Sequence, residues 1–285
     1  MTGPSVVAIG GGHGLSTVLE AMVERASSLV GVVSVADDGG SSGRIRRDLD
    51  IVAPGDMRRC LAALTPEGLM RDALEHRFEG GVLAGHPAGN VVLAAMLELE
   101  PDPVVVMDTM VEMVGARGRV LPATSVAVDL VATTERGTVK GQVAISESGA
   151  IRSLRFLPVD PEVPVAVSEA IVDADLIVLG PGSLYSSVLA PVVPGVAAAL
   201  QRRSGVLAYV ANLSAEPGET DGYDLDDHID AVERHGTSPD AVIVDANAYI
   251  PGRHQDRIRT YELVGALQSA HDPRRLAAAL FDLVS

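Results

Sequence analysis

Cysteine, basic residues and long apolar runs are all scarce in this chain. Cys60 is the single cysteine among 285 residues, which excludes an internal disulfide framework and suits a reducing compartment. Lysine and arginine number 22 against 38 acidic residues, and the net charge of −16 argues against non-specific binding to nucleic acid. No uninterrupted apolar stretch approaches the roughly 18 to 20 residues of a membrane span. We therefore expect a cytoplasmic protein with no nucleic-acid partner and no membrane span.

Hydrophobic residues, in contrast, make up 47% of the chain, which is enough for a large core. Short apolar runs alternate with segments of helical periodicity. This order predicts an α/β fold, a Rossmann-like and mostly parallel sheet with helices on both faces. In the middle of the chain the period changes, and there we expect strands at 120–124, 125–133, 138–145 and 151–158. The whole chain, 1–285, is thus predicted to be a single Rossmann-like domain with a β-rich insertion at about 119–158.

The first turn of the chain is rich in glycine and follows a short apolar run. Its central residues are Gly11, Gly12, His13 and Gly14. Because a helical pattern begins at once, the order predicts a strand, an anion-binding turn and a helix. Leu15 takes the place of the last glycine of a dinucleotide fingerprint, and no lysine follows as in a P-loop. We expect this turn to hold the pyrophosphate of a nucleotide, but not in an ordinary NAD dehydrogenase.

A second polar turn follows the second predicted strand, 30–36. It contains Asp37 and Asp38, about where a dinucleotide-binding fold holds its ribose-binding carboxylate. Gly39 and Ser41 come next and can form a second anion-binding nest. Ribose needs only one carboxylate, so Mg²⁺ binding through Asp38 is an open alternative, and a flexible surface loop is another. Catalytic residues are not determined by the sequence, although Asp37 and Asp38 are the candidates.

Two patterns that suggest a nucleophile carry less weight. G-x-S-x-G occurs at 39–43, but two aspartates separate it from the strand, where a nucleophile elbow needs a direct turn. Cys60 lies in an apolar helical stretch, so we expect it to be buried rather than reactive. Histidine and cysteine do not cluster at zinc spacing. Ser41 is therefore interpreted as part of an anion-binding loop.

The other polar turns follow predicted strands or open a helix. Gly182 and Ser183 follow a buried strand, Asn212 follows the next one, and Asn90 precedes an apolar helix. In an open parallel sheet, the loops at the carboxyl ends of the strands line one crevice. We therefore expect these residues to join the first two turns in one ligand site. For Arg59, which follows a candidate loop, we expect exposure to solvent.

Six motifs occur in the order found in one protein family. They are GGGHGLS at 10–16, DDGGSSG at 37–43, PGDMRRCL at 54–61, GHPAGN at 85–90, LGPGSLY at 179–185 and PGET at 217–220. In this order they resemble the gluconeogenesis factor family, which is related to 2-phospho-L-lactate transferase, an enzyme of deazaflavin coenzyme assembly. The resemblance covers the chain to about residue 247. It implies a Rossmann-like fold and a cytoplasmic bacterial protein.

The resemblance also implies a role in carbon metabolism, cell shape and envelope synthesis, with binding of UDP-sugars such as UDP-N-acetylglucosamine. The chain departs from the family at several polar positions. His13 stands where many relatives have threonine, Pro87 lies in a segment that often reads Gly-His-Ser, and Asp245 occupies a position that is often asparagine. From the end of the chain, only Arg275 is carried over, as a phosphate partner.

Two functions remain open. The first is a regulatory protein that binds a nucleotide sugar, a UDP-sugar or alternatively NAD, without turnover. The second is an Mg²⁺-dependent transferase that moves a phosphate-linked group from a nucleotide donor to an acceptor hydroxyl. A deazaflavin acceptor needs a flat apolar slot, and with no tryptophan, three phenylalanines and five tyrosines the composition favours the first function. Both are compatible with a homo-oligomer and with protein partners in envelope synthesis.

Overall fold

The computed structural model describes residues 3–214, 218–248, 252–265 and 270–285, and within them seven parallel strands form the central sheet. The order is β10-β9-β8-β7-β1-β2-β3, and every neighbouring pair is parallel. The strands are β1 Ser5–Gly10, β2 Ser28–Val33, β3 Arg119–Pro122, β7 Leu176–Leu179, β8 Val206–Val210, β9 Ala241–Asp245 and β10 Ile258–Tyr261. This arrangement confirms the predicted Rossmann-like α/β fold.

The central strands are apolar along their whole length. β7 reads Leu-Ile-Val-Leu and is buried throughout, and in β1 the side chains from Val6 to Ile9 are buried as well. A parallel sheet is covered by helices on both faces, so its inner strands have no side that faces water. Their β-branched residues also favour extended backbone. The short apolar runs of the sequence are therefore the strands of the sheet's interior.

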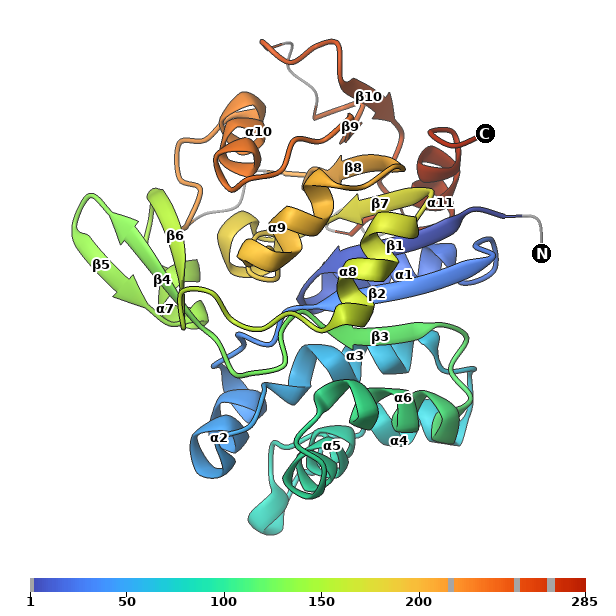
Figure 1. Ribbon diagram of the computed structural model, residues 1–285, viewed down its shortest axis with the longest axis vertical. Helices are drawn as coiled ribbons and strands as arrows, with labels where there is room; N and C mark the ends of the chain where they lie inside the picture. The colour runs from blue at the N-terminus through green and yellow to red at the C-terminus, as the bar shows by residue number, and fades with distance from the viewer. Residues whose placement is uncertain (1–2, 215–217, 249–251, 266–269) are drawn as a thin grey trace.

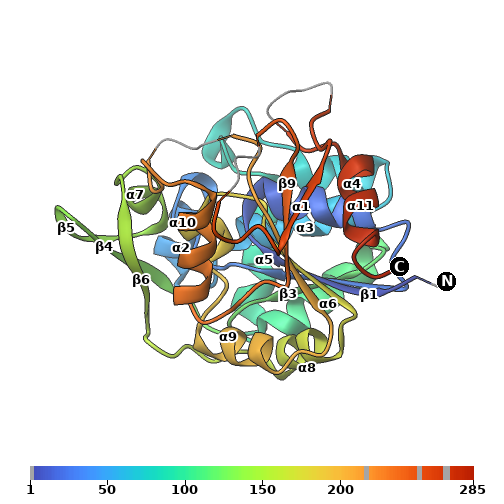
Figure 2. The same ribbon diagram turned by 90° about the horizontal axis from the view of Figure 1, so that it is seen from above.

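Helices cover both faces of the sheet (Figure 2). One face packs on α1 Gly12–Met22, α3 Pro54–Leu64, α5 Ala88–Leu99, α6 Pro103–Val114 and α11 Pro273–Phe281. The other packs on α8 Val165–Asp173, η2 Leu184–Val188, α9 Pro194–Gln201 and α10 Leu225–Arg234. Alternate residues of β1 belong to the two clusters, because successive side chains of a strand point to opposite faces. Within the described residues, no helix is both long and apolar enough to cross a membrane.

A smaller antiparallel sheet stands beside the large one, on the left in Figure 1. It consists of β4 Asp129–Thr134, β5 Gly137–Lys140 and β6 Ile151–Leu157. The block expected at 119–158 is thus divided, since 119–122 is β3 of the large sheet. The strand prediction for 138–145 is wrong from residue 142 onward, where α7 Gln142–Ser146 begins. A single domain with an insertion stays a prediction.

The direction of strand addition reverses beside β1. β2 and β3 lie on one side of it, and β7 to β10 lie on the other. At such a reversal the connections after two neighbouring strands leave in opposite directions, which opens a crevice at the carboxyl edge of the sheet. In Figure 1 the strands run from right to left, so this edge faces the small sheet. The turns after β1 and β7 therefore border the expected ligand crevice.

Candidate functional site

The turns after β1 and β7 touch each other at the edge of the sheet. A Cβ atom on Gly14 would lie 1.9 Å from the carbonyl oxygen of Pro181, so no side chain fits there. Beside this contact is a cavity of about 380 Å³, which we call the turn cavity. Among its lining residues are Gly11, His13, Gly14, Gly182, Ser183 and Asn212. The structure thus brings together six of the residues that the sequence assigned to the ligand.

Helix α1 directs its N-terminus at the turn cavity. Gly11 is the N-cap and has no side chain to cap the helix, Asp56 accepts the N–H of Gly12, and Gly12 takes φ of +63°, a value that favours glycine. The first turn of a helix has N–H groups without intrahelical partners, and the helix dipole adds positive charge there. A helix of this kind binds phosphate groups readily. The turn after β1 therefore has the geometry of an anion seat.

Asn212 supports the turn after β7, and both ends of its amide are bonded to that turn. Its Oδ1 accepts the N–H of Gly182 at 2.9 Å, and its Nδ2 donates to the carbonyl oxygen of the same residue at 3.0 Å. Glu219, from the PGET motif, accepts the N–H groups of Tyr185 at 2.7 Å and Ser186 at 3.2 Å. Two separate motifs thus hold the turn after β7 in place.

Asp56 and Arg59 lie beneath the first turn. The Arg59 guanidinium donates to Asp56 at 2.8 Å, and a Cβ atom on Gly11 would lie 2.9 Å from the other Asp56 oxygen. Burial, and then the charge of Asp37, raise the pKa of Asp56 to about 6. Arg59 is also the main reason that the pKa of His13 is lowered, with burial second. The expectation of a solvent-exposed Arg59 is wrong, because its side chain is only 26% exposed.

The two adjacent aspartates have different surroundings. Asp37 accepts the N–H of Gly39 at 2.9 Å and lies close enough to Asp56 for their charges to interact. Both oxygens of Asp38 accept hydrogen bonds from α7. Oδ2 accepts the N–H of Gln142 at 3.1 Å, and Oδ1 accepts the N–H of Val143 at 3.0 Å. Among the described residues, no group of three or more histidine, cysteine or acidic side chains could hold a metal ion. Mg²⁺ often binds through one carboxylate together with ligand phosphates, and Asp37 fits that arrangement better than Asp38 does.

A second cavity, of about 170 Å³, lies beside the second turn and contains four more of the predicted residues, Asp37, Gly39, Ser41 and Asn90, but not Asp38. It is lined by three arginines, Arg58, Arg59 and Arg77, and we call it the arginine cavity. Ser41 and Asn90 also line it, and the Asn90 amide donates to Ser41 Oγ at 3.0 Å. Gly39 belongs to the same lining. The residues that the sequence assigned to a single site are therefore distributed over two cavities.

His86 joins the group around Ser41. Its Nδ1 lies 2.8 Å from Ser41 Oγ. Burial, followed by the charges of Arg44 and Arg77, lowers the pKa of His86, so the neutral ring is favoured near neutral pH. A neutral ring can accept the Ser41 hydroxyl proton in a hydrogen bond. This pairing fixes the orientation of Ser41 at the start of α2 Gly40–Leu49.

A third cavity, of about 390 Å³, adjoins the turn cavity, because Asn212 and Ser214 line both. Tyr223, Leu225 and Val244 give it apolar walls, and we call it the apolar cavity. Sequence reasoning missed these residues. Aliphatic and aromatic residues are common in any core, so only their position beyond the carboxyl ends of β8 and β9 distinguishes them.

Arg275 does not join the site. On α11 it lies 3.5 Å from Glu262, and both side chains are at least half exposed. Asp245, at the end of β9, uses one oxygen to accept the N–H groups of Leu263 and Val264. Its carboxylate therefore supports the chain after β10. Neither residue is among those lining the turn or arginine cavities.

Comparison with known proteins gives consistent results. A family model described as 2-phospho-L-lactate transferase CofD matches residues 6–285. A Mycobacterium tuberculosis protein provisionally named gluconeogenesis factor is 42% identical over 305 residues, covering 96% of this chain and 89% of the relative. A gluconeogenesis factor of Halalkalibacterium halodurans is 42% identical over 236 residues, covering 81% and 73%. A crystal structure of a UPF0052 family member from Bacillus halodurans superposes with a TM-score of 0.92 at 34% identity, over 98% of this chain and 99% of that one.

Proposed function

The chain belongs to the 2-phospho-L-lactate transferase CofD family, and we propose that it is a transferase. It binds a nucleoside diphosphate-linked donor and transfers a phosphate-linked group to an acceptor hydroxyl. One observation carries the proposal. The N-terminus of α1 faces a cavity that it shares with the turn after β7, at the reversal of the strand order. Diphosphates bind at this position in folds of this kind.

The residues around the turn cavity suit such a transfer. The acceptor oxygen forms a bond to phosphorus, the bond from that phosphorus to the nucleoside monophosphate breaks, and the hydroxyl proton passes to a base. Asp56, with a pKa of about 6, is partly protonated at neutral pH and its ionised form can take that proton. Arg59 supplies positive charge beside the phosphates. Mg²⁺, if held by Asp37 in the neighbouring arginine cavity, would supply further positive charge beside the Asp56–Arg59 pair.

The apolar cavity supplies room for a ring of the donor or of the acceptor. Leu225 and Val244 form aliphatic walls, and Tyr223 adds an aromatic ring. The scarcity of aromatic residues in the whole chain therefore weighs less against a flat acceptor than composition alone suggests. Ligand pockets are mostly apolar with a few polar groups that set orientation.

A second candidate is a regulatory protein that binds a UDP-sugar without turnover. It is favoured by the occupied carboxylate of Asp38, which leaves a single suitable metal ligand in the second turn. The names of the relatives, gluconeogenesis factors, agree with it. Both candidates need the same diphosphate seat, so they differ in turnover and in metal dependence.

Calorimetry with GDP, UDP-N-acetylglucosamine and NAD, each with and without Mg²⁺, tests the seat. We expect at least one of the diphosphate ligands to bind and Gly14→Ala to weaken it by about tenfold or more, because the new methyl group separates the two turns. Gly80→Ala is the matched control, since its Cβ atom would have no neighbour within 4 Å. If none of these ligands binds, both candidate functions are wrong.

Turnover separates the two candidates. Phosphorus NMR can follow the slow release of nucleoside monophosphate from the bound diphosphate, with water in place of the acceptor hydroxyl. The transferase predicts release that depends on Mg²⁺ and is lost in Asp37→Asn, whereas Asp48→Asn, an exposed change on α2, behaves as wild type. Binding without release, unaffected by Mg²⁺ and by Asp37→Asn, would establish the regulator instead.

A further inference from the structure

Three helices begin at the arginine cavity. The first turns of α2, α3 and α5 contribute Ser41, Gly55 and Asn90 to its lining. These helices have 10, 11 and 12 residues, and no side chain caps any of the three N-termini. Each first turn has N–H groups without intrahelical partners and carries the positive end of a helix dipole. Their convergence directs the positive ends of three helix dipoles at the cavity, against the carboxylates of Asp56 in the first turn of α3 and Asp37 in the lining.

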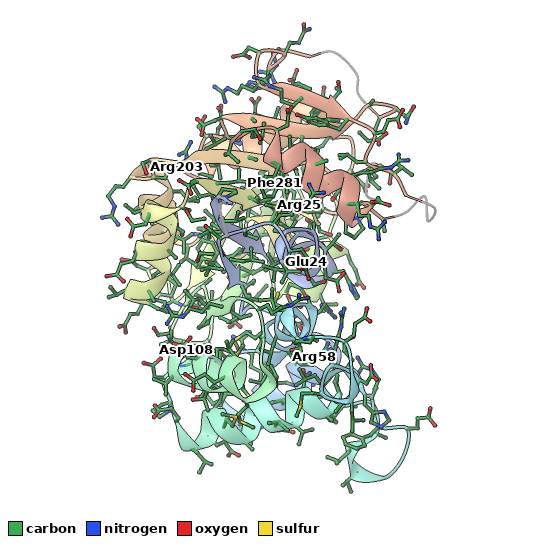
Figure 3. The ribbon with its side chains drawn as sticks, turned by 90° about the vertical axis from the view of Figure 1, so that its right-hand side faces the viewer. Glu24, Arg25, Arg58, Asp108, Arg203 and Phe281 are labelled. Atoms are coloured by element: carbon green, nitrogen blue, oxygen red, sulfur yellow. The ribbon has the colours of Figure 1, made fainter. Side chains whose placement is uncertain are left out.

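Arg58 adds a buried cation whose donors are not all used. It is 5% exposed, and its Nε has no hydrogen-bond partner among the described residues. One terminal nitrogen pairs with Glu75, and the aliphatic stem packs beside Gly89. Figure 3 labels Arg58 among the blue and cyan helices of the lower half of the molecule. A buried donor without an acceptor costs free energy, so the position favours a ligand that brings acceptor oxygens.

Asn90 presents a second unused group to the same cavity. The residue is 2% exposed, and its Nδ2 donates to Ser41 Oγ while Oδ1 has no partner among the described residues. A half-turn of the amide exchanges its two ends. Oδ1 would then accept the Ser41 hydroxyl proton, which requires the His86 tautomer whose Nδ1–H donates to Ser41 Oγ, and the Nδ2 N–H groups would be available to a ligand. The amide can therefore donate to an anion without losing its bond to Ser41.

Arg77 and Asp37 complete the charged lining. Arg77 is exposed, and its guanidinium group donates to the carbonyl oxygen of Gly85. Asp37 has one oxygen bonded to the N–H of Gly39. Arg59, also in the lining, is paired with Asp56 beneath the first turn. This Asp56–Arg59 pair therefore lies between the arginine cavity and the turn cavity.

We infer that the arginine cavity binds a phosphate group, as a second anion site separate from the diphosphate seat in the turn cavity. Donors that approach from three helices and from guanidinium groups match a tetrahedral oxyanion, whereas a carboxylate can be satisfied within one plane. Only one part of the inference rests on the proposed function, namely that this phosphate belongs to a substrate of the transfer reaction. The substrate phosphate and the diphosphate would then lie on opposite sides of the Asp56–Arg59 pair.

Inorganic phosphate is the probe for this site. In calorimetry at saturating GDP, so that the diphosphate seat is filled, wild-type protein should bind phosphate more tightly than acetate at the same concentration. Arg77→Gln should raise the dissociation constant for phosphate about tenfold, the loss of one charge-assisted contact. Asn90→Asp should abolish binding, because it adds negative charge inside the cavity. Arg71→Gln, the same change on α4 Leu69–Glu75 outside this lining, should behave as wild type.

Three results would overturn the inference. The first is phosphate binding in Arg77→Gln that equals wild type, and this variant keeps the test valid even if Asn90→Asp fails to fold. The second is competition, in which GDP displaces phosphate and the two cavities behave as one seat. The third is acetate that binds as tightly as phosphate. If none of GDP, UDP-N-acetylglucosamine and NAD binds, the proposed function fails, while the effect of Arg77→Gln on phosphate still decides the second anion site.

Discussion

At the scale of single residues, Asp56 lies buried beside Arg59 and near Asp37, and burial raises the pKa of its carboxyl from 3.8 to about 6. Between about pH 4 and about pH 6, the Asp56 carboxyl group is therefore mostly protonated in the folded protein and mostly ionised in the unfolded chain. The free energy of unfolding contributed by this group is highest below about pH 4 and falls as pH rises to about 6.

Asp56→Asn should remove this dependence, because asparagine does not ionise. Between about pH 4 and pH 7, the free energy of unfolding of the variant should fall less than that of wild type, by on the order of 3 kcal/mol. Urea unfolding at the two pH values measures the difference. Asp48→Asn, an exposed change, should follow wild type. Parallel pH dependences in wild type and Asp56→Asn would show that Asp56 ionises normally in the folded state.

The carboxylate pair of the site could not be read from the sequence. Asp37 and Asp38 are adjacent along the chain, and their spacing suggested that they act together. In the fold, Asp38 turns to α7 while Asp37 interacts with Asp56, which comes from α3. Asp56 lies in the first turn of α3, whose N-cap is Ala53, and nothing in the sequence pairs it with Asp37. The two carboxylates that interact, Asp37 and Asp56, are close in the fold and not adjacent in the sequence.

At the scale of elements, α7 depends on Asp38 and on a glycine. Gly141 precedes the helix with φ of +100°, and a Cβ atom there would lie 2.3 Å from the Asp38 carboxylate. The carboxylate then accepts two N–H groups at the helix N-terminus. The sequence around 138–145 is β-rich and predicted a longer strand, because an acidic cap from more than 100 residues away leaves no local signal.

Asp38→Ala should therefore loosen α7. The loss of an acidic N-terminal partner costs about 1 kcal/mol, and the amide hydrogens of 142–146 should exchange faster with solvent. Hydrogen exchange with mass spectrometry measures this directly. Asp38→Asn, which keeps one acceptor oxygen, should be intermediate, and Asp48→Ala should have no effect on this segment. Unchanged protection of α7 in Asp38→Ala would contradict the capping role.

Most strands of the large sheet could be predicted, because a buried parallel strand is an apolar run that ends in a polar turn. β1, β7, β8 and β9 follow this rule. β3 did not, since 119–122 is followed at once by other β-rich segments and looked like part of the same block. β3 pairs with β2, and the chain between these two strands consists of helices and turns, so no local pattern shows that they are neighbours.

At the scale of the whole molecule, the position of the crevice followed from a general rule, but its division did not. The sequence predicted that glycine-rich and polar turns gather at one edge of the sheet, and the turns after β1 and β7 do so. The separation of the arginine cavity from the turn cavity depends on where α2, α3 and α5 begin in space. Those positions come from packing on the sheet, which no local pattern records.

Net charge gives a prediction for the molecule as a whole. A charge of −16 on a chain of this size produces repulsion in the compact state, and salt screens it. The exposed ion pairs, such as Arg152 with Glu135, contribute little in return. The melting temperature should therefore rise by a few degrees between about 20 mM and about 300 mM sodium chloride.

Thermal unfolding followed by circular dichroism tests this. Arg77→Gln should show the same rise as wild type, which separates screening from chloride bound in the arginine cavity. A melting temperature that falls with salt would mean that the surface ion pairs outweigh the repulsion between acidic residues.

β1, an inner strand of the large sheet, is synthesised before the other six strands of that sheet. β1 needs β7 on its second edge, and the Ser5 backbone bonds to Asp175, 170 residues later. At bacterial synthesis rates that interval lasts on the order of 10 to 30 seconds, during which β1 has an unpaired apolar edge. The ligand crevice can therefore form only after β7 and the turn that follows it have been made.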